Sequence, residues 1–268
     1  MVATFHKCAI LISFGAALAC AQGDSADGAA LNNLGVSLRL ASRPAEAMVK
    51  FNAAIKMAEA SGDDRLLATA LGGLGASLVD LGEFARAQPV LRRGLALFEK
   101  LTGPDSLETG EAANNLAMVY RKSGELAQAQ RQLERALPLM EKCLGARSVE
   151  LEIGFNNMFI VLAEQKQWDR AEPYLLRALE IGRALPDSPE RADIEENLAL
   201  LQAHRGEFHE AAQTMEQVVA MEERILGPED PRLAGSLESY AGYLKKISHK
   251  AEAEQAERRA RLIRRAAL

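Results

Sequence analysis

The sequence repeats six times with a period of 40 to 42 residues, and this period restricts the fold more than any other feature. Segments that begin "LNNLG", "LGGLG", "ANNLA", "FNNMF", "EENLA" and "LESYA" align without a gap. The fourth residue of each segment, here called the anchor, is apolar or aromatic: Leu34, Leu74, Leu116, Met158, Leu198 and Tyr240. Thirteen residues after each anchor stands an alanine: Ala47, Ala87, Ala129, Ala171, Ala211 and Ala253. The register of these matches indicates a true repeat array.

Each repeat has the pattern of two helices joined by a short turn. Apolar residues follow helical spacing in the first half of a repeat, as in Leu31, Leu34 and Leu38, and in the second half, from Ala47 through Phe51. Short breakers such as "LGE", "SGE" and "RGE" separate the halves, and "TGPDS" or "LPDSP" separates the repeats. Only 5% of the residues are aromatic, which also favours an all-α protein over a sandwich or barrel.

Small residues after the anchor have a packing reason. Gly35, Gly75, Ala117, Ala199 and Ala241 occupy this position, where a larger side chain would hold two helices apart. Phe159 breaks the rule, so we expect local repacking or a wider helix separation in the fourth repeat. A single helix pair cannot bury its own apolar face, and stacking of neighbouring pairs completes the core.

The Leu-Gly or Leu-Ala pair, the residue four positions after the anchor (Tyr120, Leu162) and the in-register alanines together resemble the tetratricopeptide repeat. The 42-residue period with "NNLA", "RALPLMEKCLG" and "LGPEDPRLA" is similar to the long-helix repeats of kinesin light chains. The resemblance covers about residues 26–268 and implies a right-handed α-solenoid of six helix pairs. Glu257 replaces an apolar residue in the sixth repeat, which suits a C-terminal cap.

Asparagines recur one residue before the anchor, on the side of the first helix that faces away from Leu31 and Leu34 at 100° per residue. Apolar residues accompany them on that side, which in an ordinary surface helix would be charged. The resemblance implies that first helices line a concave surface, so these residues are candidates for a peptide-binding groove. The candidates are Asn33, Asn115, Asn157, Asn197, Val36, Met118, Ile160 and Leu200.

Two alternatives stay open for these amides. They contact a bound peptide, or they hydrogen-bond a neighbouring helix and serve only the array. In chaperone-binding relatives a cluster of Lys and Arg clamps a terminal carboxylate, and Arg39 and Arg121 are the best candidates here, although two residues are too few to predict a clamp. Asn32, on the edge of the packed side, is only a weak candidate.

The N-terminus has the layout of a secretory signal peptide: Lys7, an uncharged run from Cys8 to Cys20, and small residues. Cleavage is expected before Gln22, which makes residues 1–21 the signal. A lipoprotein signal with lipid attached at Cys20 is the competing interpretation, and an uncleaved apolar helix is the third. The mature chain keeps 31 basic and 37 acidic residues, a balance that argues against a nucleic-acid binder.

No catalytic or metal-binding motif accompanies the repeats. His204 and His209 are five residues apart, a poor spacing for one helix face. Cys143 is expected to be a partly buried structural thiol, and Trp168 a packing residue at the start of a second helix. The Arg-rich segment from Arg258 to Arg265 suits either an anionic lipid or acidic partner, or the exposed face of a capping helix whose Leu262 and Ile263 cover the core.

The sequence therefore predicts a non-catalytic scaffold, without cofactor, metal, small-molecule substrate or nucleic acid, that binds a protein or peptide along its concave surface. We expect it to be exported to the periplasm or secreted. Membrane contact is expected only through a lipid at Cys20 or the Arg-rich C-terminus. The alternatives are a self-associating or lipid-anchored component of an envelope complex, and the sensing partner of a separate enzyme.

Overall fold

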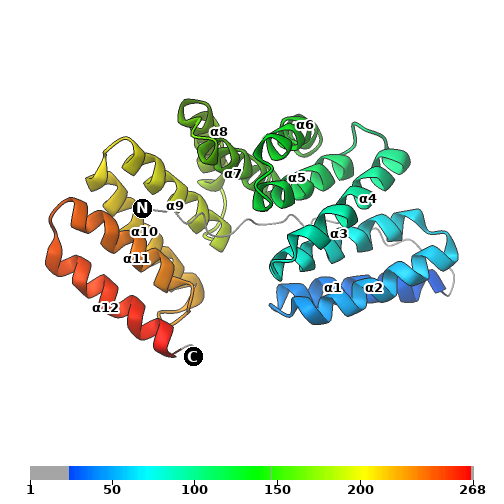
Figure 1. The fold of residues 1–268 in the computed structure, drawn as a ribbon, viewed down its shortest axis with the longest axis horizontal. Coiled ribbons are helices and arrows are strands. Elements are labelled where there is room, and N and C mark those ends of the chain that lie inside the picture. The colour runs from blue at the N-terminus through cyan, green and yellow to red at the C-terminus, as the bar shows by residue number, and fades with distance from the viewer. Residues whose placement is uncertain (1–23, 146, 267–268) are drawn as a thin grey trace. The chain divides into compact units, whose positions relative to one another are not determined.

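A computed structural model of the chain describes residues 24–145 and 147–266, so the expected signal peptide lies outside the described ranges. All regular elements in these ranges are α-helices, as the repeat pattern predicts (Figure 1). The helices are α1 (Asp24–Leu40), α2 (Pro44–Ser61), α3 (Asp64–Asp80), α4 (Phe84–Thr102), α5 (Leu107–Lys122), α6 (Leu126–Leu144), α7 (Val149–Glu164), α8 (Trp168–Gly182), α9 (Pro189–His204), α10 (Phe208–Leu226), α11 (Leu233–Lys246) and α12 (Lys250–Ala266).

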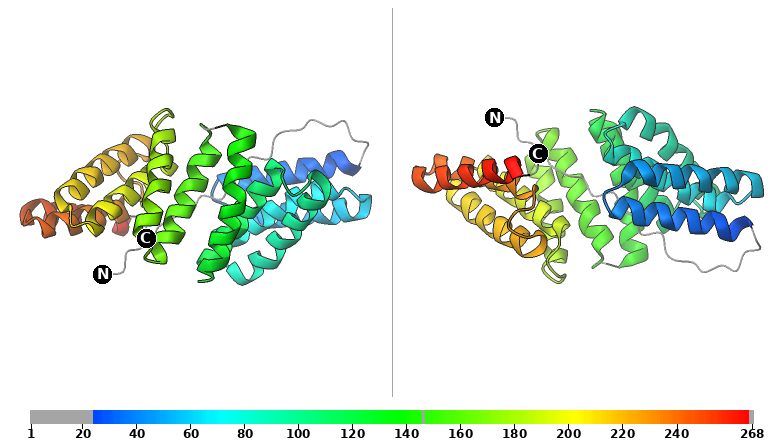
Figure 2. Two further views of the ribbon diagram at one scale, coloured as in Figure 1. Left: turned by 90° about the horizontal axis from the view of Figure 1, so that it is seen from above. Right: turned by 90° about the horizontal axis from the view of Figure 1, so that it is seen from below.

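The described chain divides into two compact units between Gln165 and Lys166. The first unit holds α1 to α7, and in it each helix packs against the next one along the chain. The second unit holds α8 to α12 with the same order of packing. Figure 2 shows the two blue helices α1 and α2 side by side from both directions. Each unit is therefore a stretch of helical repeats in which a helix contacts mainly its sequence neighbours.

The turn inside each pair uses one left-handed residue eight positions after the anchor. Glycine occupies it at Gly82, Gly124 and Gly206, with φ between 75° and 83°. Ser42, Lys166 and Ser248 adopt the same conformation with φ between 58° and 65°. Side chains with a Cβ are disfavoured there, so the repeated turn geometry, and not the residue, is the fixed feature of the array.

Serine and aspartate begin the first helices, as the linkers between repeats predict. The hydroxyls of Ser106, Ser148 and Ser188 each accept a hydrogen bond from the backbone N–H three residues later, and the Asp63 carboxylate does the same. These side chains satisfy backbone donors that have no partner inside the helix.

The small residues beside the anchors are required by close helix contacts. A Cβ on Gly75 would lie 2.4 Å from Leu91 of α4, and one on Gly35 would lie 2.8 Å from the Phe51 ring of α2. Both distances are shorter than van der Waals contact permits. Phe159, the exception in the fourth repeat, is fully buried in α7. The division between the two units falls at the turn that follows this helix.

The ends of the array correct two expectations. The Leu34 side chain, predicted to be buried like the other anchors, is 45% exposed, because α1 is the first described helix and packs mainly against α2 and α3. Leu262, predicted to cover the last core, is 64% exposed, while Ile263 beside it is buried among Ala253, Ala256 and Ala260. Successive residues of a helix point about 100° apart, so only one of these two neighbours faces the core.

None of the described helices combines the length and apolar character that a membrane span requires.

Candidate functional site

The predicted row of asparagines differs in exposure along the chain. Asn115 in α5 and Asn157 in α7 are almost completely buried, with exposed fractions of 2% and 1%. Asn33 in α1 is exposed, and Asn197 in α9 of the second unit is buried. The row is therefore not a uniform set of open amides, and its buried members lie in α5 and α7 of the first unit and in α9 of the second.

Asn157 connects two neighbouring first helices. Its Nδ2 donates a hydrogen bond to Oδ1 of Asn114 in α5 at 3.1 Å, and Asn114 is fully buried. This bond joins α7 to α5 directly, which is the structural role that the sequence left open for the amides. A buried amide with a partner of this kind stabilises the helix contact, whereas an unpartnered one would cost free energy.

Half of this amide pair has no partner among the described residues. Nδ2 of Asn114 and Oδ1 of Asn157 are buried and make no hydrogen bond within that part of the chain. One is a donor and the other an acceptor, which is the set that a peptide group needs for its own C=O and N–H. The pair therefore holds α5 and α7 together, and its two remaining polar atoms are buried out of reach of a ligand.

The sequence treated the first asparagine of each pair as an edge residue, and in the third repeat the structure gives it the central role. Asn114 is more deeply buried than Asn115, and its equivalent in α1, Asn32, is also buried. The recurrence of asparagine two residues before the anchor, at Asn32, Asn114 and Asn156, is the sequence signal that pointed to it.

The apolar candidates lie one helical turn from the amides. Met118 follows Asn115 in α5 and is fully buried, and Ile160 follows Asn157 in α7 with 2% exposure. Val36 in α1 and Leu200 in α9 are half-buried. In α5 and α7, amide and apolar side chains therefore alternate on one helix face, as the 100° spacing predicts.

The two candidate cations already have carboxylate partners. The Arg39 Nε lies 2.6 Å from Oδ2 of Asp80 in α3, and Arg121 forms an ion pair with Glu164 in α7. Both pairs join a first helix to the next first helix at equivalent positions. A terminal carboxylate of a ligand would have to compete with Asp80 or Glu164, so this surface carries little free positive charge.

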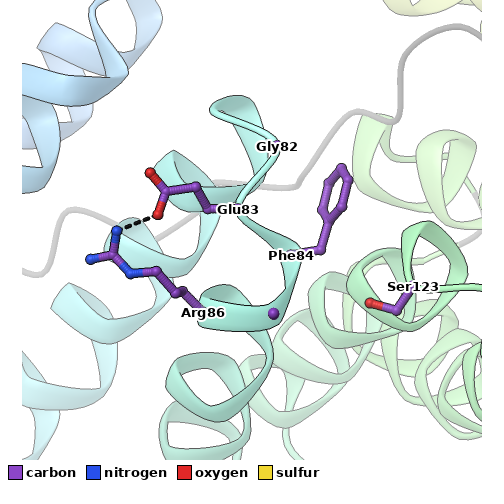
Figure 3. Close-up of a pocket in the computed structure, with 6 residues that line it drawn as sticks. Gly82, Glu83, Phe84, Arg86 and Ser123 are labelled. Carbon is purple, nitrogen blue, oxygen red and sulfur yellow. Dashed lines mark hydrogen bonds and ion pairs between the residues drawn. The ribbon is translucent and has the colours of Figure 1, made fainter.

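A shallow pocket of about 500 Å³ lies apart from these residues, at the turn between α3 and α4. Figure 3 shows Phe84 and Ser123 on neighbouring segments that line this pocket, and Glu83 forms an ion pair with Arg86. The pair neutralises both charges, and the lining has no group suited to acid–base or nucleophilic chemistry. The pocket gives no support for a catalytic site.

In the second unit, a carboxylate occupies a position that is apolar elsewhere. Glu195 in α9 is half-buried and corresponds to Leu31, Leu71 and Leu237 in other repeats. Burial raises the pKa of Glu195, and Arg191 and Arg183 oppose the shift. Burial, and to a smaller extent the negative charge of Glu196, raises the pKa of Tyr243 to about 12. The Tyr243 hydroxyl is neutral at physiological pH.

Other chemically reactive side chains are dispersed. The thiol of Cys143 is exposed, contrary to the expected partly buried position, because it lies on the outer side of the last turn of α6. Trp168 packs as expected, with its ring stacked on His204 at a centroid distance of 4.1 Å. Within the described ranges, no group of three or more His, Cys, Asp or Glu side chains is placed to hold a metal ion.

Solved structures with the same fold come from several helical repeat proteins. The chain is similar to BtubC (BKLC) from P. vanneervenii, with 20% identity, a TM-score of 0.65, and coverage of 92% of this chain and 93% of that one. It is also similar to a putative kinesin light chain from Podosopora anserina with nearly identical TPR-like repeats, at 21% identity and a TM-score of 0.61, covering 76% and 97%.

The type IV pilus biogenesis factor PilW matches with 18% identity and a TM-score of 0.64, over 85% of this chain and 90% of that one. At these identities the likeness establishes the fold alone. No curated protein sequence matches the chain.

The tetratricopeptide repeat family model matches residues 27–100, 66–142 and 152–223. These ranges cover most of α1 to α10, including both helices that carry the Asn114–Asn157 bond. The repeat resemblance read from the sequence is thereby confirmed, and the chain belongs to the tetratricopeptide repeat family.

Proposed function

We propose that the chain is a non-catalytic scaffold that binds an extended protein segment along the surface of its first helices, in an exported compartment. Tetratricopeptide repeats are protein-interaction modules, and a repeat array offers an extended surface instead of an enclosed pocket. The observation that carries the proposal is the match of the family model to residues 27–100, 66–142 and 152–223, which cover most of the first helices α1, α3, α5, α7 and α9.

An extended segment suits the accessible part of the asparagine row. Asn33 on α1 is exposed, and its amide offers donors and an acceptor to a peptide backbone. Val36, one turn away and half-buried, adds an apolar contact that does not depend on the partner's charge. Because Arg39 and Arg121 are ion-paired, we propose that this surface recognises the backbone and apolar side chains of the partner and not an acidic tail.

The test is the affinity of a peptide selected from a random display library against the folded chain. The double variant Asn33→Ala with Val36→Ala is expected to weaken binding by about tenfold or more, since it removes a polar and an apolar contact side chain from the same surface. Asn52→Ala is the matched control, because Asn52 is an exposed asparagine on α2 whose amide bonds only its own helix at Met48.

Both variants must keep the melting temperature of the parent protein for the comparison to count. Equal affinity of the double variant and the parent would exclude the amide surface as the binding site. The alternative function, an array whose amides serve only helix packing, predicts that equal affinity.

The exported location depends on the first 21 residues. If the signal peptide is cleaved as proposed, the intact mass of the exported protein will correspond to a chain that begins at Gln22. A diacylated Cys20 terminus would instead favour the lipid-anchored component of an envelope complex. The full-length mass would contradict export by cleavage.

A sensing partner for a separate enzyme remains a second use of the same surface. The enzyme in that case is the bound protein, and the amide surface is its docking site.

A further inference from the structure

The two ends of the repeat array are not equivalent, and the N-terminal end is the one that stays apolar. On α1 the residues Ala30, Leu31, Leu34 and Leu38 form a stripe, here called the α1 face. Leu34 at its centre is 45% exposed, and Leu31 and Leu38 are half-buried. The equivalent leucines of α3 (Leu71, Leu74 and Leu78) are buried, because α2 packs against them.

The C-terminal end carries charges at the positions that cover such a face. Inside the array, second helices use apolar residues there: Phe51, Ile55 and Ala58 in α2, and Leu91, Leu95 and Phe98 in α4. The corresponding residues of α12 are Glu257, Arg261 and Arg264. Each forms an ion pair, with Lys245, Glu257 and Glu238 respectively. The C-terminal end therefore presents ion-paired side chains to water, whereas the N-terminal described helix presents leucines.

We propose that the α1 face is a dimerisation surface, covered by the α1 face of a second copy of this chain in antiparallel orientation. A two-fold axis at Leu34 places Leu34 of one chain against Leu34 of the other. Ala30 and Leu38 are each four positions from Leu34, so the small Ala30 of one chain lies against the large Leu38 of the other. Small residues opposite large ones let two helices approach closely, and an isologous contact of this kind closes as a dimer.

The charges around the α1 face select the antiparallel orientation. Asp27 lies two turns before Leu34 on the same side of the helix, and Arg43 follows the turn two helical turns after it. Antiparallel copies bring Asp27 of one chain near Arg43 of the other, but Arg43 already pairs with both carboxylate oxygens of Glu46, so the orientation rests on keeping the two Asp27 carboxylates apart. Parallel copies would bring Asp27 against Asp27. The stripe between Ala30 and Leu38 contains no charge, so no buried ion is left without a partner.

Sedimentation equilibrium of the full chain tests the proposal. We expect a dimer of the 29.0 kDa chain at tens of micromolar. Leu34→Glu is expected to raise the dimer dissociation constant by at least tenfold, because it places two carboxylates together at the axis. Leu262→Glu is the matched control, since Leu262 is an exposed leucine on α12 at the opposite end, and it is expected to leave the dimer intact.

A disulfide trap checks the geometry independently of affinity. In a chain that begins at Gln22, which lacks Cys8 and Cys20, and that carries Cys143→Ser, Leu34→Cys is expected to form a covalent dimer on oxidation, and Leu262→Cys is expected to remain monomeric. A monomeric parent at 100 µM, a Leu34→Glu variant that dimerises as tightly as the parent, or equal cross-linking at both positions would overturn the proposal. Far-UV circular dichroism confirms that each variant is folded. None of these results depends on the amide surface, so the scaffold proposal is tested separately.

Discussion

At the scale of single residues, Glu195 shows how one side chain departs from the repeat. Five of the six repeats place Leu, Ala or Phe three residues before the anchor, and the fifth places a half-buried carboxylate there. Burial disfavours the charged form and raises the pKa of Glu195 above its ordinary value of 4.5. The folded state therefore holds this proton more tightly than the unfolded state.

The sign of the pH dependence follows from that difference. Below the unfolded pKa the side chain is neutral in both states and costs nothing. As pH rises through the unfolded and then the folded pKa, the unfolded state loses its proton first and the second unit loses stability. Glu195→Gln is therefore expected to raise the unfolding midpoint of this unit at pH 7 by a few degrees, with little effect at pH 4.5.

The fluorescence of Trp168 measures this effect, since it is the single tryptophan of the chain and lies in the same unit. Glu180→Gln, an exposed glutamate on α8, is the control and is expected to change neither value. An equal gain for Glu195→Gln at both pH values would show that burial of its charge is not the cause.

At the scale of elements, successive second helices are joined by a repeated ion pair. Arg93 of α4 pairs with Glu59 of α2 at 2.8 Å, Arg135 of α6 with Glu99 of α4, and Arg259 of α12 with Glu223 of α10. Arg135 and Arg259 each also donate to a proline carbonyl in the preceding linker, at Pro104 and Pro228. This pair cannot form between α8 and α10. Arg183, directly after α8, replaces the glutamate, and Gln217 of α10 replaces the arginine.

Arg135→Ala tests the contribution of this contact. The pair is about one-third exposed, so we expect a loss of only about 0.5–1 kcal/mol in the free energy of unfolding, from one ion pair and one carbonyl hydrogen bond. Urea denaturation followed by circular dichroism measures it. Arg131→Ala, one turn earlier and exposed on the same helix, is expected to be neutral. If both changes destabilise equally, the loss is one of helix propensity and not of the contact.

At the scale of the whole molecule, each of the two units has its own apolar core. Leu133 of α6 is fully buried in the first unit, and Met215 of α10 is buried in the second with Ala192, Ala199 and Val218. Repeat arrays gain stability mainly from neighbouring helices, so we expect the units to unfold as separate cooperative steps.

Core substitutions in each unit test this expectation. Leu133→Ala is expected to cost about 2–5 kcal/mol and to shift the circular dichroism transition while the Trp168 transition stays in place. Met215→Ala is expected to shift the Trp168 transition. A Trp168 transition that moves equally in both variants would mean that the units unfold as one.

The sequence by itself determined the repeat period, the helix pairs, the turns and the small residues beside the anchors. These features depend on the local backbone and on periodic burial, both of which are properties of a short stretch of chain. Gly35 and Gly75 illustrate this, because the contacts that forbid a Cβ recur in register with the repeat.

Only the tertiary structure decided which side chains meet across repeats. It showed that Asn114 accepts the hydrogen bond from Asn157, although Asn115 was the groove candidate in α5. It also showed that Arg39 and Arg121 form ion pairs with Asp80 and Glu164. It also exposed Leu34 and Leu262 at the ends. These outcomes depend on which described helix lies alongside, and that helix is about 40 residues away in sequence. A residue's own repeat carries no record of that neighbour.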